Sequence, residues 1–165
     1  MKDPSTSTLD AQTREAVNAV LSRIPCGRFL LTAGHDGRTR GVLVSWVQQV
    51  SAEPAMVLVA LEKGREIVPL IHESHSFALS QVAADDKLTL RKFSADTLDE
   101  DPLESLEIMR RATGSPILAR TQAFVDCELV RHLDIEGDHD LYVGVVRDGG
   151  LLKGGAVHVE VADGK

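Results

Sequence analysis

Short runs of alternating apolar and polar residues dominate the chain, and only a few segments show the wider spacing of a helix. Residues 9–25 place apolar side chains three or four positions apart, which predicts an amphipathic helix. Thr8 or Asp10 is suited to cap its start, and Pro25 closes it. The polar residues 1–8 ahead of this helix are expected to form a loose tail.

Strand-like segments follow at short intervals. Residues 28–34 and 41–51 flank Asp36-Gly37, a pair typical of a two-residue hairpin turn. Further strands are predicted over residues 56–62, 75–83, 123–137, 138–150 and 156–161. Helices are predicted over residues 65–74, 85–94 and 102–112, with an acidic loop around residues 96–102.

Closely spaced strands with turn signals favour a mainly β fold, an antiparallel barrel or sandwich with a few peripheral helices. A hydrophobic content of 43% supports one domain with a real core over residues 1–165, of which residues 1–8 are the tail. No apolar run is long enough to span a bilayer, and the N-terminus lacks the apolar centre of a signal peptide. These features indicate a cytoplasmic protein.

The charge balance argues against a nucleic-acid partner. The net charge is −7 and the pI is about 5.3, whereas proteins that grip a phosphate backbone carry a basic face. Aromatic residues make up only 4% of the chain, so there is no platform for stacking single-stranded bases. An ordinary acidic surface is the simpler interpretation.

Several well-known sites have no motif in this sequence. There is no Gly-x-Gly-x-x-Gly after a strand, no Walker loop and no nucleophile elbow. His72 and His75 lack an obvious third ligand, so they are interpreted as helix-end histidines and no metal site is predicted. Cys26 and Cys127 have apolar neighbours and are predicted to be buried small hydrophobes.

Neutral polar side chains interrupt the apolar pattern of the segment GVLVSWVQQVS, Gly41–Ser51. In a continuous strand, alternation places Ser45, Gln49 and Ser51 on one face. An uncharged polar face suits a flat, hydrogen-bonding ligand. Plain exposure to solvent explains the same residues equally well.

Two further segments carry candidate chemistry. Lys63 and Arg65 end an apolar strand and are separated by Gly64, an arrangement that suits a phosphate group but is also common on a solvated surface. His139 lies between two aspartates, which favour its charged form, so it is suited to dock a polar ligand or deliver a proton. A surface hairpin is the alternative interpretation of that segment.

In their order along the chain, these segments resemble the flavin-reductase-like family of FMN-binding split β-barrels. Gly41–Ser51 aligns without a gap with a family strand of the type Gly-Met-Thr-Val-Ser-Ser-Phe-Thr-Ser-Val-Ser. Residues 137–146, GDHDLYVGVV, resemble the family's Gly-Asp-His-Thr-Leu-Phe-Ile-Gly-Glu-Val. The resemblance extends from about Pro25 to His158, and the form with Trp46 is closest to flavoredoxin-like members.

The resemblance implies an antiparallel Greek-key split barrel that forms a homodimer, with FMN in a groove by the dimer interface. It implies that His139 lies beside the flavin, near where a nicotinamide docks. The implied cofactor-binding residues are Val44, Ser45, Trp46, Gln49 and Ser51 for the ring and ribityl chain, Lys63 and Arg65 for the phosphate, and Ser80 near the ribityl or phosphate.

The sequence departs from the family pattern at Leu43 and Ile67, where the family has Thr, and at Ser80, where it often has Asn. These changes leave FAD as an alternative to FMN. The implied activity is an NAD(P)H-dependent flavin reductase, with NAD(P)H as co-substrate, such as the reductase component of a two-component monooxygenase. The alternatives are a flavoredoxin-like carrier that takes electrons from a protein partner, and a non-catalytic flavin-binding domain.

Overall fold

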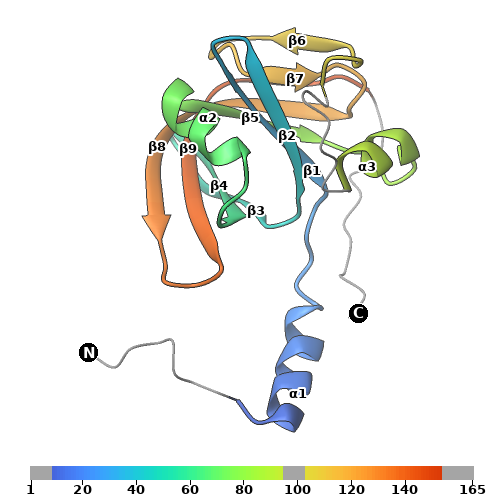
Figure 1. Ribbon diagram of the computed structural model, residues 1–165, viewed down its shortest axis with the longest axis vertical. Helices are drawn as coiled ribbons and strands as arrows, with labels where there is room; N and C mark the ends of the chain where they lie inside the picture. The colour runs from blue at the N-terminus through green and yellow to red at the C-terminus, as the bar shows by residue number, and fades with distance from the viewer. Residues whose placement is uncertain (1–8, 95–102, 154–165) are drawn as a thin grey trace.

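The computed structural model describes residues 9–94 and 103–153. The predicted tail over residues 1–8, the acidic loop over residues 96–102 and the last strand over residues 156–161 lie outside these residues. Figure 1 shows a curved β-structure with small helices around it and one helix set apart from it. The expected mainly β fold is confirmed.

Seven antiparallel strands form one sheet that curves into a split barrel, in the order β2-β1-β5-β8-β9-β4-β3. A separate two-stranded sheet, β6-β7, lies at one side (Figure 1). The strands are β1 Phe29–His35, β2 Arg38–Val44, β3 Val47–Ala52, β4 Ala55–Glu62, β5 Ser76–Gln81, β6 Ile108–Arg110, β7 Pro116–Leu118, β8 Ala123–Asp134 and β9 His139–Leu151.

The hairpin predicted at Asp36-Gly37 is confirmed. Both residues have positive φ, 47° and 79°, as the tight turn between β1 and β2 requires. The single strand predicted over residues 41–51 is wrong, because the chain breaks at Ser45 and Trp46 into β2 and β3. The two strands then pair with different neighbours, β2 with β1 and β3 with β4.

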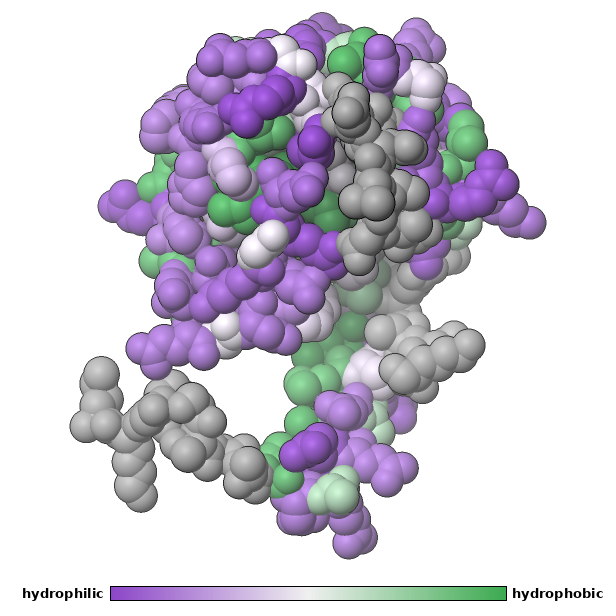
Figure 2. Space-filling model, viewed as in Figure 1, coloured by the Kyte–Doolittle hydropathy of each residue, from purple (hydrophilic) through white to green (hydrophobic). Residues whose placement is uncertain are grey.

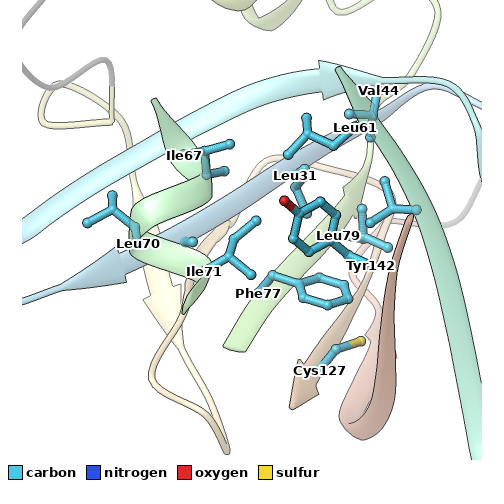
Figure 3. Close-up of a cluster of buried hydrophobic side chains, with 12 residues drawn as sticks. Leu31, Val44, Leu61, Ile67, Leu70, Ile71, Phe77, Leu79, Cys127 and Tyr142 are labelled. Carbon is cyan, nitrogen blue, oxygen red and sulfur yellow. The ribbon is translucent and has the colours of Figure 1, made fainter. Parts of the chain in front are cut away.

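The barrel interior is filled by apolar side chains from all sides. Figure 3 shows Ile67 and Ile71 of α2 (Ile67–Ser74) directed toward Phe77 and other side chains from the strands, and Leu70 of the same helix belongs to the same cluster. All of these side chains are almost fully removed from water. At about 25 cal/mol per Å² of apolar surface, this burial is the main stabilising contribution to the barrel.

The two cysteines differ in their surroundings. Burial in the core raises the pKa of Cys127 to about 12, so its thiol stays protonated and behaves as a small hydrophobe. Cys26 is only half-buried, so the expectation of burial is confirmed for Cys127 and wrong for Cys26.

Two other helices lie outside the barrel core. In α1 (Ala11–Leu21), the predicted cap is confirmed at Asp10, whose Oδ1 accepts a hydrogen bond of 2.9 Å from the Thr13 N–H. No residue of α1 is buried, and it stands away from the barrel (Figure 1). In α3 (Lys87–Ser94), Phe93 packs against Leu30 in a second apolar cluster.

The helix predicted over residues 102–112 is wrong. A turn with Leu103 buried in the second cluster leads into β6, where Ile108 pairs with Leu118 of β7. The apolar residues of this segment therefore make two different contacts, Leu103 in the second cluster and Ile108 in β6, and do not form one helical face. Among the helices of residues 9–94 and 103–153, none has the length and apolarity needed to cross a membrane.

Aromatic and charged groups lie together where α2 meets β8 and β9. The ring of His132 stacks on Tyr142 with centroids 4.6 Å apart, and its Nε2 lies 3.1 Å from Asp140 Oδ2. His72 of α2 meets His132 edge-on at 4.9 Å. Partial burial lowers the pKa of His72, and the nearby His132 and His75 lower it further.

We expect His72 to weaken the fold at mildly acidic pH. Its pKa in the folded state lies below that in the unfolded chain, so unfolding takes up a proton. Its contribution to the free energy of unfolding is therefore complete above about pH 6.5 and declines as the pH falls below that value.

Urea unfolding at pH 7.5 and pH 5 measures this effect. His72→Phe keeps a ring in the stack and is expected to reduce the acid-induced loss of stability, because phenylalanine takes up no proton on unfolding. His35→Gln, a change outside this cluster, is the control. An equal loss in His72→Phe and the unsubstituted protein would contradict the assignment.

Candidate functional site

A pocket of about 300 Å³ opens where β2 ends, beside the ends of β4 and β9. Its walls come from segments far apart in the sequence, which the sheet order brings together. The lining residues are Val42, Leu43, Val44, Ser45, Trp46, Ala60, Leu61, Glu62, Arg65 and His139. Six of these ten residues are apolar, and Glu62 and Arg65 are the two with an acidic or a basic side chain other than histidine.

The break between β2 and β3 forms one wall of the pocket. Ser45 and Trp46 lie between two strand registers. The β1–β2 register ends at Val44, and the β3–β4 register begins at Val47. The Trp46 carbonyl accepts a hydrogen bond of 2.9 Å from the Ala60 N–H, which fixes the wall against β4. No hydrogen bond from the N–H of Ser45 or Trp46 is found within residues 9–94 and 103–153, so both groups are candidates to bind a ligand.

The second wall is His139, the first residue of β9. Its register partner on β4 is Glu62. The centroid of its ring lies 4.6 Å from that of the Trp46 ring, at an interplanar angle of 41°. Trp46 keeps 59% of its surface exposed despite this contact. The two rings form an open aromatic corner, a shape suited to a flat ligand.

Asp138 fixes the orientation of His139. Its Oδ1 lies 2.8 Å from Nδ1 of His139. The side-chain hydrogen bond with His139 lowers the pKa of Asp138, so the carboxyl group is ionised at neutral pH. Because an ionised carboxylate only accepts hydrogen bonds, Nδ1 carries the proton, and Nε2 is the ring nitrogen left for a ligand.

Arg65 is the cation in the lining of the pocket. Gly64 has a φ of +80°, a turn that only glycine adopts easily, and Arg65 follows it. Its Nη2 lies 2.5 Å from Glu62 Oε2, and both residues line the pocket. A guanidinium held in this way is suited to bind a phosphate or carboxylate in a bidentate manner.

Lys63 does not share this position, although the sequence predicted it together with Arg65. Its Nζ lies 2.7 Å from Asp134 Oδ1 and 3.4 Å from Asp140 Oδ1, on the β8–β9 hairpin. Lys63 is absent from the pocket lining. The turn at Gly64 therefore separates two cations that are two residues apart in the sequence.

The structure brings together Val44, Ser45, Trp46, Arg65 and His139 of the predicted site residues. Gln49 and Ser51 lie along β3 outside the pocket, where the Gln49 side-chain amide donates a 3.2 Å hydrogen bond to the Ser51 carbonyl. These two residues follow the strand break, so the face that they were expected to share with Ser45 is interrupted.

Ser80 lies in β5, away from the pocket lining. It is fully buried and pairs with Leu30 of β1 and Phe124 of β8. Its hydroxyl finds no hydrogen-bond partner within the part of the chain that the structure describes. Alternation places it on the face of β5 that carries Ala78, opposite the core residues Phe77 and Leu79.

The sequence reasoning missed five pocket residues, Val42, Leu43, Ala60, Leu61 and Glu62. Glu62 is the most consequential, because it contacts Arg65 and pairs with His139. Its place at the end of an apolar strand was visible in the sequence. Its proximity to His139 depends on the β4–β9 register, which no local pattern reveals.

A family model described as "Flavin reductase like domain" matches residues 21–159. Among curated proteins, the chain is 30% identical over 139 residues to "Putative diflavin flavoprotein A 2" of Synechocystis, covering 83% of this chain and 24% of that protein. It is 33% identical over 137 residues to an uncharacterized protein of Aeropyrum pernix, covering 79% and 50%. The chain thus spans about a quarter to a half of the length of these relatives.

Solved structures with the same fold include nitrilotriacetate monooxygenase component B from Mycobacterium thermoresistibile, with a TM-score of 0.76, 22% identity and coverage of 87% of this chain and 78% of that one. The NADH:FAD oxidoreductase SgcE6 of Streptomyces globisporus has a TM-score of 0.75, 23% identity and coverage of 90% and 89%. BorF, the flavin reductase component of a bacterial two-component tryptophan halogenase, has a TM-score of 0.74, 25% identity and coverage of 84% and 87%.

The structural likenesses agree with the split-barrel fold, and the family model covers most of the chain. On this evidence, the chain belongs to the flavin-reductase-like family.

Proposed function

We propose that this protein is an NAD(P)H-dependent flavin reductase that binds FMN, or FAD in its place, in the pocket between Trp46 and His139. The observation that carries the proposal is this open aromatic corner with Arg65 in the pocket lining, in a chain that belongs to the flavin-reductase-like family. Ligand pockets usually measure about 300–1,000 Å³. A pocket of about 300 Å³ suits the ring of a flavin, with the remaining part of the cofactor outside it.

The donor set fits a flavin. The ring needs several hydrogen bonds and little charge, which the Ser45 side chain and the backbone N–H groups of Ser45 and Trp46 would supply. Val44 and Leu61 would give apolar contact, and Arg65 would bind the phosphate. The bound flavin supplies the redox chemistry, accepting a hydride from NAD(P)H.

The chain's own residues bind and orient the reactants. Trp46 shields one side of the ring site from water, and its contact with His139 holds the imidazole at the pocket mouth. Asp138 keeps the proton on Nδ1 of His139, so Nε2 faces the ligand as a hydrogen-bonding group. His139 is therefore the residue proposed to receive the nicotinamide and to support hydride transfer.

The purified protein is expected to bind FMN or FAD and to oxidise NADH or NADPH only when flavin is present. A flavin absorption titration measures binding, and the loss of nicotinamide absorbance measures turnover. His139→Ala is expected to lower kcat about tenfold. Protein that binds no flavin, or that binds flavin without nicotinamide oxidation, would contradict the reductase proposal.

Arg65→Met is expected to weaken FMN binding at least about tenfold and riboflavin binding much less, because a charge-assisted hydrogen bond contributes about 1.5–3 kcal/mol. Fluorescence quenching of the two flavins measures both dissociation constants. Arg147→Met, which removes a cation paired with Glu128 outside the pocket lining, is the matched control. Equal weakening of FMN and riboflavin would show that Arg65 does not hold the phosphate.

A flavoredoxin-like electron carrier is the second candidate function. The net charge of −7 favours docking to a basic protein partner. Stable flavin binding without NAD(P)H oxidation, together with reduction by such a partner, would favour this function. The reductase proposal has further support, because one protein of the same fold is the flavin reductase component of a two-component tryptophan halogenase and another is component B of a nitrilotriacetate monooxygenase. An oxygenase that consumes reduced flavin is accordingly the proposed partner.

We also propose that the protein forms a homodimer. The helix α1 buries no residue against the barrel, and its apolar side chains face water. Figure 2 shows apolar surface where α1 and the connecting segment leave the barrel. Exposed apolar groups on this segment are Leu9, Val17, Val20, Leu21 and Ile24. A surface of this kind is typical of an interface.

Sedimentation equilibrium is expected to give twice the mass of one chain. Replacing Val20 and Leu21 with Glu is expected to give a monomer, because two charges would be buried at the interface. Replacing exposed Glu15 on the same helix with Gln is the control and should leave the mass unchanged. A monomeric unsubstituted protein would contradict the proposal.

A further inference from the structure

Lys63 contacts the β8–β9 hairpin through both its backbone and its side chain. Its N–H donates a 3.0 Å hydrogen bond to the Asp138 carbonyl. Its ammonium group lies 2.7 Å from Asp134 Oδ1 and 3.4 Å from Asp140 Oδ1. The hydrogen bond to Asp134 raises the pKa of Lys63, so the side chain is a cation at any physiological pH. Lys63 therefore contacts both residues that flank His139.

Asp134 and Asp140 are direct partners across the two strands. Like charges directly opposite each other destabilise a strand pair. The Asp140 side chain is only 15% exposed, and its Oδ1 accepts no hydrogen bond from the residues that the structure describes. The Lys63 ammonium group offsets the repulsion between the two carboxylates, and His132 lies 3.1 Å from the other oxygen of Asp140.

The same contacts shape the turn that leads to His139. Asp134 Oδ1 accepts a 2.8 Å hydrogen bond from the Glu136 N–H, and Glu136 has a positive φ of 59°. A non-glycine residue in this conformation needs support from its surroundings. Lys63 and Glu136 thus share one carboxylate oxygen, which links the turn of the hairpin to the end of β4.

Alternation along β9 places Asp140 and His139 on opposite faces. Asp140 lies on the face of Tyr142, which is buried in the barrel core, whereas His139 lies against Trp46 at the pocket. Figure 1 shows the β8–β9 hairpin extending beyond the rest of the barrel, so neighbouring strands support its tip on few sides. The contacts of Lys63 with Asp134 and Asp140, on the face of β9 opposite His139, are therefore well placed to fix the position of His139.

We propose that Lys63 is a positioning residue that clasps the β8–β9 hairpin through Asp134 and Asp140, so that His139 is held against Trp46. This role replaces the phosphate contact expected from the sequence. Its catalytic consequence rests on the proposed function of the pocket. The clasp itself does not, and it is testable in the protein without any flavin.

The first test measures the hairpin in the flavin-free protein. Lys63→Met keeps the aliphatic stem and removes the charge, so hydrogen exchange over residues 131–142 is expected to quicken at least about threefold. Emission of Trp46, the single tryptophan, is expected to change because its contact with His139 loosens. Lys87→Met, at an exposed lysine of α3, is the control, and Lys63→Arg should restore most of the protection.

A second substitution tests the charge argument. Adding Asp134→Asn to Lys63→Met removes the repulsion with Asp140, so the double variant is expected to regain part of the lost protection. No change in exchange or Trp46 emission in Lys63→Met would overturn the clasp. A double variant as unprotected as Lys63→Met would overturn the role assigned to the facing carboxylates.

The third test separates positioning from phosphate binding. Lys63→Met is expected to lower kcat for nicotinamide oxidation about tenfold, with the ratio of FMN to riboflavin dissociation constants unchanged within about twofold. A selective loss of FMN affinity would overturn the proposal and return Lys63 to the phosphate. Unsubstituted protein without turnover would count against the reductase function alone, because hydrogen exchange and Trp46 emission still decide the clasp.

Discussion

Closure of the barrel depends on one constraint: β2 and β3 are consecutive along the chain, yet they occupy opposite edges of the seven-stranded sheet. Only the two residues Ser45 and Trp46 join them. The two edges must therefore approach each other, and the sheet curves until they do. A strand that continued through this point would keep β3 beside β1 and leave the sheet open.

The pocket follows directly from that constraint. Where the edges meet, two residues leave the strand ladders, and β4 passes beside them with a hydrogen bond from Ala60 to Trp46. The β4–β9 register then sets Glu62 opposite His139, which brings the imidazole to the same place. The pocket therefore lies where the two edge strands of the sheet, β2 and β3, are joined.

Local patterns predicted much of this fold because they depend on neighbours in sequence. The turn at Asp36-Gly37, the cap at Asp10 and the helix α2 all follow from residue types within a few positions. The break at Ser45 could not be predicted in this way, because residues 42–53 contain no Gly, Pro, Asn or Asp to mark a turn. The helix expected over residues 102–112 failed for a related reason, since tertiary contacts of Leu103 outweigh its local spacing.

The divergence of Lys63 and Arg65 shows why the site was only partly predictable. Residues two apart at the end of a strand share a face, so the sequence alone places both cations at one ligand. Gly64, which has a positive φ, turns the chain between them. Lys63 pairs with the carboxylates of the β8–β9 hairpin, whereas Arg65 pairs with Glu62 in the pocket lining. Two aspartates facing each other need a nearby cation, whatever ligand binds elsewhere. The charge of Lys63 is thus engaged within the fold, and Arg65 is the residue of this pair that stands at the pocket.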